Sequence, residues 1–423
     1  MNPYKIDNTE NRAFGSASAV ARRCTLRLMV AAPLLVAAPW TMAQTESVLY
    51  SFTGGADGGS PSTGLVLDAK GNFYGTTPAG GLLKHGCGTQ GCGTVFELTP
   101  SGVETVLHTF TGTNDDGKFP DAPLLLDPSG NLYGTTVSGG ANKQGTVFEL
   151  TPTGTETVLY AFTVGADGAS PGGGLVRDAE LNLYGTTISG GHYDGTVFEL
   201  TPSGAETVLF TFDGQDGEYP ATRLLRAAGN LYGTVSEGGG SPGCAPPGCG
   251  LIFEVTSGGI EGTLYTFTGA ADGARPAGAL LRDAQGNLYG TAAWGGTMNS
   301  SCPQGCGTVY EVSPAPGSTW SLTVLHSFTG EGDGYHPVAS LVRDAKGNLY
   351  GITSGDACLV SACSGTVFEI TAAGVEKVLY IFTGGADGGY PYGDLVRDKK
   401  GNLYGTTQRG GAFNEGAVFK VTP

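Results

Sequence analysis

Short stretches in which apolar and polar residues alternate recur along the chain and predict β-strands. In the first complete unit we expect strands at about residues 64–68, 72–77, 93–99 and 105–110. Clusters of Gly, Asn, Asp and Pro separate these stretches, as is typical of turns between strands. Gly71 and Gly102 stand where a tight hairpin needs a positive φ. The local pattern therefore predicts four short strands, each joined to the next.

This unit occurs seven times. The phrase Asn-Leu-Tyr-Gly, with Phe for Leu in the first copy, begins at Asn72, Asn131, Asn182, Asn230, Asn287, Asn348 and Asn402. The phrase Asp-Gly-x-x-Pro begins at Asp57, Asp116, Asp167, Asp216, Asp272, Asp333 and Asp387. Four strands in a repeat of 48 to 61 residues are typical of propeller blades. A β-solenoid is the less favoured alternative, because its rungs are shorter and more regular in length.

The two ends of the repeat region predict how the ring closes. The region begins with a strand of the fourth type, Val48–Phe52, and ends with a strand of the third type before Pro423. We therefore expect residues 46–52 to pair with 416–421 and complete the last blade. Such closure leaves no exposed sheet edge. The predicted fold is an all-β, seven-bladed β-propeller with four-stranded blades, spanning residues 44–423.

The N-terminal segment has the features of an export signal. Five basic residues between Lys5 and Arg27 precede an apolar stretch from Leu28 to Trp40, and the small residues Thr41 and Ala43 follow. This order predicts a secretory signal peptide at 1–43, cleaved after Ala43. The apolar stretch is too short for a spanning helix, so we expect no membrane span in the mature chain. The predicted location is extracellular or periplasmic.

Composition narrows the possible classes. Glycine contributes 74 of 423 residues, which disfavours helices, and a hydrophobic share of 39% disfavours disorder. Loss of residues 1–43, with five basic and two acidic side chains, would take the formal net charge from −16 to −19. So acidic a surface repels phosphate backbones, and no nucleic acid partner is expected. We expect a monomer.

Eight of the nine cysteines follow the predicted signal peptide, and they form four close pairs. The pairs are Cys87 with Cys92, Cys244 with Cys249, Cys302 with Cys306, and Cys358 with Cys363, each in the link between the second and third strands of a unit. Local pairing, an even count and export together predict four disulfides. A zinc site is the alternative, but it requires two pairs to converge, and these pairs belong to separate units.

The repeated phrases also resemble a known family. Gly-Asn-Leu-Tyr-Gly-Thr, the Gly-Gly that precedes Gly-Thr-Val-Phe-Glu-Leu-Thr, and Asp-Gly-x-x-Pro together resemble the GloVer (Gloeo/Verruco) extracellular repeat and, more distantly, NHL-type propeller repeats. The resemblance implies a secreted bacterial protein. Two turns depart from the pattern, at Leu181 and around Arg226–Gly229, and we expect both to differ locally.

The seven repeated aspartates have two possible roles. Asx-type turns, in which the carboxylate accepts backbone hydrogen bonds, explain their presence in every unit. A ring of carboxylates that attracts calcium is the alternative. We predict no cofactor, with calcium as the one candidate.

Binding residues are better sought where the repeats differ. The residue before the repeated proline is Ser60, Phe119, Ser170, Tyr219, Arg275, His336 or Tyr390, and Tyr335 adjoins one of them. Aromatic faces beside hydrogen-bonding groups suit sugar rings or peptide side chains. The predicted ligand-binding residues are therefore Phe119, Tyr219, Arg275, Tyr335, His336 and Tyr390. Ordinary packing between blades is the alternative.

Three functions are compatible with this pattern. The favoured hypothesis is an exported, non-enzymatic module that binds an extracellular glycan, peptide or protein through one face of loops. The second is a polysaccharide lyase or hydrolase with a site in the central funnel, built from Arg223, Arg275, His336 and Asp394. The third is a structural surface or matrix protein. Fold alone does not choose among them.

Overall fold

The computed structural model describes residues 45–423, apart from 84–85, 114, 192–193, 242, 245–246, 257, 260, 318 and 356–363. The predicted signal peptide at 1–43 lies outside the described residues, and so do Cys358 and Cys363. Within the described residues all regular secondary structure is strand. No helix there has the length and hydrophobicity needed to cross a lipid bilayer.

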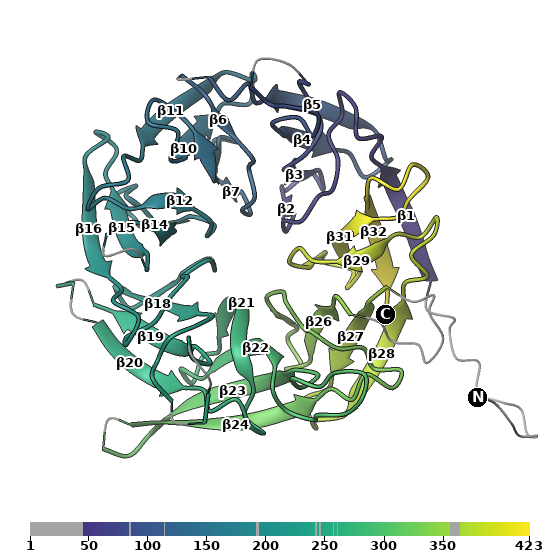
Figure 1. Cartoon of the computed structure of the whole chain (residues 1–423). Helices are drawn as coiled ribbons and strands as arrows, with labels where there is room; N and C mark the ends of the chain where they lie inside the picture. Colours follow the sequence, from purple (N-terminus) through teal and green to yellow (C-terminus); the bar gives the residue numbers. More distant parts are fainter. Residues whose placement is uncertain are drawn as a thin grey trace, which may run out of the picture. The chain divides into compact units, whose positions relative to one another are not determined.

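The strands form seven antiparallel blades around an axis (Figure 1). Blade 1 contains β2 (Val66–Leu67), β3 (Phe73–Thr77), β4 (Thr94–Leu98) and β5 (Glu104–Thr109). Blade 2 contains β7 (Leu125–Leu126), β8 (Leu132–Thr136), β10 (Thr146–Leu150) and β11 (Glu156–Ala161), with the small β6 (Gly117–Lys118) and β9 (Ser138–Gly139) beside it. Blade 3 contains β12 (Ala169–Pro171), β13 (Val176–Arg177), β14 (Leu183–Ser189), β15 (Thr196–Leu200) and β16 (Glu206–Thr211).

The remaining blades follow the same order. Blade 4 contains β17 (Leu225–Ala227), β18 (Asn230–Val235), β19 (Leu251–Val255) and β20 (Glu261–Thr266). Blade 5 contains β21 (Ala274–Arg282), β22 (Leu288–Trp294), β23 (Thr308–Ala315) and β24 (Thr319–Ser327). Blade 6 contains β25 (Val342–Arg343), β26 (Leu349–Thr353), β27 (Thr366–Ile370) and β28 (Glu376–Ile381). Blade 7 contains β29 (Gly389–Pro391), β30 (Val396–Arg397), β31 (Leu403–Arg409), β32 (Ala417–Thr422) and β1 (Thr45–Ser51).

Blade 7 combines the two ends of the described chain. β1 pairs antiparallel with β32, from Thr45 opposite Thr422 to Ser51 opposite Ala417. The outermost strand of this blade therefore comes from the start of the chain and its inner strands from the end (Figure 1). Both the seven-bladed propeller and its predicted closure are confirmed.

Each junction between neighbouring blades is filled by two aromatic rings. Phe52 of blade 7 packs edge-on against Phe96 of blade 1 with ring centroids 5.1 Å apart, and the other six junctions repeat this contact. Both rings are fully buried. A Cβ atom at Gly75 would lie only 2.7 Å from Cζ of Phe96. The glycine of Asn-Leu-Tyr-Gly is therefore required by close packing of the ring against the neighbouring strand.

Two turns were predicted to differ from the others, and only one of them does. Leu181 adopts a left-handed φ of 70° and donates its N–H to the Asp178 carbonyl at 3.4 Å, as Gly71 does to Asp68 at 3.2 Å. The expectation of a different turn is therefore wrong at Leu181, because the exposed leucine tolerates the glycine conformation. In blade 4, Ala228 and Gly229 both have positive φ and join β17 to β18 through a two-residue turn, so that turn does differ.

Candidate functional site

One face of the ring is built by the long links of the repeat, and we call it the loop face. It comprises the link from each outer strand to the next blade, such as 52–65, and the link between the second and third strands, such as 78–93. These links hydrogen-bond to one another: the Gly59 N–H donates to the Ala79 carbonyl at 2.9 Å. The short turns, such as 68–72 and 99–103, form the opposite turn face.

The variable residue before the repeated proline has the same backbone conformation in all seven copies. Its φ lies between 52° and 59° at Ser60, Phe119, Ser170, Tyr219, Arg275, His336 and Tyr390. This left-handed region costs an L-residue roughly 1–2 kcal/mol, and glycine is its usual occupant. None of the seven copies has glycine there. The sequence predicted the variability but not the shared strain.

A backbone hydrogen bond holds each of these residues in place. The N–H donates to a carbonyl in the preceding blade, over 2.7 to 3.3 Å. The acceptors for Phe119, Arg275 and His336 are the carbonyls of Cys92, Cys249 and Cys306; the others are those of Glu415, Gln144, Asp194 and Ser364. The strained residues are thus fixed at the junctions between blades.

Three of the four predicted disulfides are present in the described part of the chain. They join Cys87 to Cys92, Cys244 to Cys249, and Cys302 to Cys306. In each, the second cysteine supplies the carbonyl that binds the strained residue of the next link. The disulfides therefore brace the loops that support Phe119, Arg275 and His336.

The fourth predicted disulfide is not among these three. It would join Cys358 to Cys363, and both cysteines lie in the segment 356–363, outside the described residues. The bond between Cys358 and Cys363 therefore stays a prediction from their spacing and from export.

The structure brings three of the six predicted residues together around Trp294. The Arg275 guanidinium carbon lies 4.1 Å from the centre of the Trp294 ring, and its Nη2 forms an ion pair of 2.7 Å with Glu237. The His336 ring is 6.2 Å from Trp294 on centroids, and Tyr335 packs edge-on against His336 at 4.6 Å. Burial lowers the pKa of His336, so its imidazole is neutral at neutral pH.

The other three predicted residues lie apart from this cluster. Tyr219 and Tyr390 are 44% and 42% exposed, which leaves ring surface free for contact. Phe119 is half-buried and lines a cavity of about 650 Å³ with Ser60, Gln90 and Val137. The loop face thus carries several separate aromatic surfaces.

The central channel collects a second group of polar residues. Arg223, Asp394, Asp121 and Tyr392 line its cavity of about 120 Å³, and Asp394 accepts the Ser340 N–H at 2.8 Å. Of the four residues considered for an enzyme, Arg223 and Asp394 line this channel, whereas Arg275 and His336 contact Trp294. The four are therefore divided between two places.

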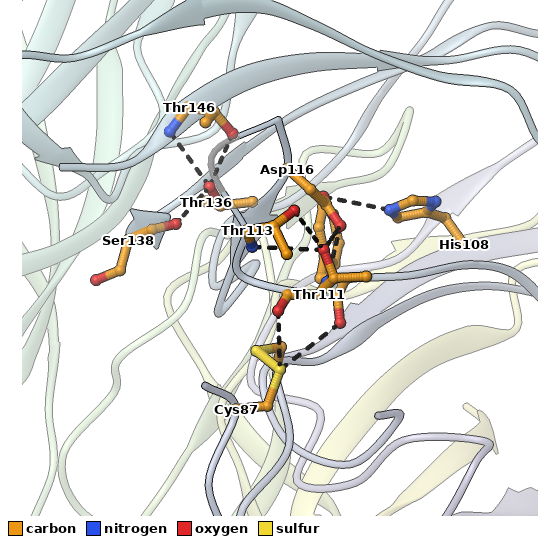
Figure 2. A network of polar contacts seen from close by, with 10 residues as sticks. Cys87, His108, Thr111, Thr113, Asp116, Thr136, Ser138 and Thr146 are labelled. Carbon is orange, nitrogen blue, oxygen red and sulfur yellow. Dashed lines mark hydrogen bonds and ion pairs between the residues drawn. A yellow bond between two sulfur atoms is a disulfide. The ribbon is translucent and has the colours of Figure 1, made fainter. Parts of the chain in front are cut away.

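The repeated aspartates act mainly as acceptors within their own links. Figure 2 shows one case: Asp116 accepts the Thr111 N–H at 2.7 Å, the Thr111 hydroxyl at 2.8 Å and the His108 ring nitrogen at 3.4 Å. Burial raises the pKa of Asp116, but the hydrogen bonds from His108 and Thr111 outweigh it and bring the pKa below its usual range. These contacts support the turn role that the sequence predicted.

Glu156 of the next blade completes a cluster that sequence reasoning missed. Ligand atoms of His108, Asp116 and Glu156 lie within 4.8 Å of one another, a donor set that suits a transition-metal cation. In other blades a tyrosine takes the place of the histidine: Tyr50 donates to Asp57 at 3.0 Å and Tyr160 to Asp167 at 3.1 Å. His108 therefore performs the same hydrogen-bonding role as these tyrosines. The spacing along the sequence gave no signal, because Glu156 comes from the neighbouring blade.

Comparison with known proteins agrees with the repeat analysis. The model of the Gloeobacter/Verrucomicrobia repeat matches residues 40–245 and 243–423. No curated protein matches the chain significantly. Among solved structures, a gluconolactonase from Xanthomonas campestris is similar at 16% identity and TM-score 0.40, over 66% of this chain and 82% of that one. A luciferin-regenerating enzyme is similar at 13% identity and TM-score 0.43, over 71% of this chain and 90% of that one. Likeness at this level does not bear on ligand or activity.

Proposed function

Since the chain belongs to the Gloeobacter/Verrucomicrobia repeat family and forms a closed seven-bladed propeller, we propose that it is an exported module whose loop face binds an extracellular glycan. Peptides and proteins are the other ligand classes that the same surface suits. The observation that carries the proposal is the presence of non-glycine residues at all seven left-handed positions.

The strain supports a binding role because it is avoidable. Glycine makes up 74 of the 423 residues and serves the turns on both sides of these positions. Residues held in sparsely populated conformations cluster at binding sites, where the side chain is needed in a fixed direction. Seven strained positions that carry five different kinds of side chain suit a binding rim, whereas a purely structural turn favours glycine.

The rigidity of the loops beneath these residues also favours ligand binding. Three disulfides brace the loops beneath Phe119, Arg275 and His336, which lowers the conformational entropy lost when a ligand binds. Exposed tyrosine rings at 219 and 390 suit stacking against sugar rings. The Arg275–Trp294 pair adds hydrogen-bond donors beside an aromatic face.

Export is part of the proposal. Cleavage after Ala43 would leave the closing strand intact, because β1 begins at Thr45. Expression in a bacterial host with N-terminal sequencing of the released protein should yield Gln44 as the first residue. Retention of the uncleaved chain in the cytoplasm would contradict export.

The binding test compares two aromatic variants with a control on the other face. Purified residues 44–423 should bind a subset of a glycan array, and Tyr219→Ala or Tyr390→Ala should weaken that binding by about tenfold. Val103→Ala removes a side chain that is 59% exposed on the turn face and should leave binding unchanged. No saturable glycan binding, or binding that both tyrosine variants retain in full, would overturn the proposal.

A polysaccharide lyase or hydrolase is the second candidate. It is supported by the presence of Arg223 and Asp394 in one channel. Turnover on a panel of polysaccharides that is abolished by Asp394→Asn would favour it over simple binding. His336→Ala should then matter only if substrate extends from the channel to the Trp294 cluster. If neither turnover nor binding is found, the structural matrix role is favoured.

A further inference from the structure

On the turn face, an arginine normally closes the groove between neighbouring blades. It lies at the end of the innermost strand, over the Asn-Leu-Tyr-Gly tyrosine of the preceding blade. The guanidinium carbon is 5.5 to 5.8 Å from the tyrosine ring centre for Arg177 on Tyr133, Arg226 on Tyr184, Arg343 on Tyr289 and Arg397 on Tyr350. Arg282 has the same register position in blade 5, opposite Leu288. Five of the seven junctions therefore have the arginine.

The other two junctions have leucine at this register position. Leu67 stands opposite Phe73 in blade 1, and Leu126 stands opposite Leu132 in blade 2. Leucine is too short to reach across the groove. A cavity of about 440 Å³ lies between blades 7 and 1, lined by Leu67, Phe73 and Tyr404. A cavity of about 510 Å³ lies between blades 1 and 2.

The groove between blades 7 and 1 also carries a positive residue at a position where the other six blades carry a negative one. The third strand of blades 1 to 6 carries a glutamate opposite the tyrosine, as Glu97 is opposite Tyr74. In blade 7 this residue is Lys420, opposite Tyr404. Lys70, Lys399 and Lys400 lie on the same groove, so four lysines line it in a chain with a formal net charge of −16.

The positive charges are available and the negative ones are occupied. Within the described part of the chain, none of the four lysine ammonium groups forms an ion pair. The groove also contains Asp68 and Asp398, which accept bonds of their own turns. Asp398 accepts the Asn402 N–H at 2.9 Å and the Tyr404 hydroxyl at 3.0 Å. Unpaired lysines at the rim thus surround an apolar wall formed by Leu49, Leu67, Phe73 and Tyr404.

We propose that this groove binds an organic carboxylate with a planar apolar body. The ring of such a ligand would occupy the space that arginine fills in five other junctions, against Leu67 and Phe73. Its carboxylate would lie among the lysines, which bind anions as flexible point charges. The cavity volume lies within the range of small-molecule sites. This site is on the opposite face from the proposed glycan-binding surface and is independent of it.

Charge and shape can be tested separately with a defined set of probes. Isothermal titration calorimetry with 2-naphthoate and its uncharged amide should show at least about tenfold tighter binding of the carboxylate. Leu67→Arg introduces the side chain that closes the other junctions and should abolish binding, although it adds positive charge. Lys420→Glu restores the repeat residue and should weaken binding by about tenfold. Leu126→Arg, in the next groove, should leave binding unchanged.

The outcomes of this experiment distinguish binding in the groove from non-specific attraction of a carboxylate to surface lysines. Equal binding of the amide and the carboxylate, or full binding by Leu67→Arg, would overturn the proposal. So would the absence of saturable binding in the unchanged protein. Thermal unfolding of each variant identifies any that fails to fold, and Lys420→Glu, which changes a half-buried side chain at the rim, then decides the question.

Discussion

The two open grooves of the turn face share one cause and have opposite character. Each is open because a leucine, Leu67 or Leu126, replaces the arginine of the other five junctions. The groove between blades 7 and 1 is lined by four lysines and two aspartates. The groove between blades 1 and 2 is lined by Asp68, Glu97, Asp127 and only Lys70. One register position therefore decides whether an arginine covers the tyrosine of the preceding blade, and another decides the charge of the groove.

The junctions beneath these grooves also differ in how the outer strand that precedes each one is held in its blade. The chain crosses both junctions, but in blade 1 a short turn at 99–103 joins β5 to β4, whereas in blade 7 only pairing with β32 holds β1. Equivalent aromatic pairs fill both junctions, Phe52–Phe96 and Phe110–Phe148. Comparison of the two junctions therefore measures how well strand pairing replaces a continuous chain.

The largest expected effect comes from removal of these rings. Phe52→Ala and Phe110→Ala should each lower the free energy of unfolding by about 3–5 kcal/mol, because both rings are fully buried. Chemical denaturation measures both values. A much smaller loss for Phe52→Ala would mean that the junction between blades 7 and 1 is not closed in solution.

The second prediction exchanges the charge of the two grooves. In a Lys420→Glu background, in which the first groove binds carboxylate weakly, Glu97→Lys should create a carboxylate site between blades 1 and 2. We expect the affinity for 2-naphthoate, measured by calorimetry, to rise by about tenfold over Lys420→Glu alone and so to return to that of the unchanged protein. If Glu97→Lys yields no binding, the groove between blades 7 and 1 owes its affinity to more than lysine and apolar lining.

The third prediction concerns pH and compares the outer glutamates of the same two junctions. Burial, with the nearby Asp57, raises the pKa of Glu104 from 4.5 to about 7. Burial and Asp116 raise the pKa of Glu156 to about 7 as well, although His108 opposes the rise. Because the folded state retains these protons longer than the unfolded state, their contribution to stability is full below pH 4.5 and is lost as the pH rises through about 7.

Glutamine substitution tests this dependence. Glu104→Gln should raise the melting temperature at pH 8 and leave it nearly unchanged at pH 4.5, as followed by circular dichroism. Glu180→Gln, at an exposed position, is the control and should show no such difference. A melting temperature of Glu104→Gln that shifts equally at both pH values would contradict the raised pKa.

The smallest expected effect comes from filling the groove between blades 1 and 2 with an arginine side chain. Leu126→Arg should place a guanidinium over Tyr74 beside Asp68 and Glu97, and raise the free energy of unfolding by about 0.5–1 kcal/mol. Leu67→Arg should give no such gain, because it meets four lysines. Equal stabilisation by both variants would mean that the charge of the two grooves has little effect.

Repetition made most of the fold predictable from the sequence. Seven copies of each phrase predicted the number of blades. Because the repeat region begins with a fourth-type strand, Val48–Phe52, and ends with a third-type strand, the sequence also predicted that the first strand completes the last blade and closes the ring. The three cysteine pairs that the structure describes were predictable for the same reason, since each is local in sequence. The six predicted binding residues were recognised only as variable positions. The left-handed conformation of five of them, all except Tyr335, was hidden, because a following proline usually favours an extended residue.

What could not be predicted depends on contacts between copies. The exchange of arginine for Leu67 or Leu126 is visible when the repeats are aligned. Its consequence requires knowledge that the side chain at this position lies over the tyrosine of the preceding blade. The grouping of Glu156 with His108, and of His336 with Trp294, likewise crosses from one unit to another. Periodicity within a unit carries no information about such neighbours.

Because Thr45 pairs with Thr422, the ring of blades can close only after nearly the whole chain has been synthesised. β1 leaves the ribosome before any other strand of the ring, and six whole blades are synthesised before its partner strand. The ring therefore cannot close until β32 has been made, and contacts this distant in sequence form slowly because a long loop must be ordered. Until the ring closes, β1 is free to pair with other chains, so its pairing with β32 is the step that ends this risk of aggregation.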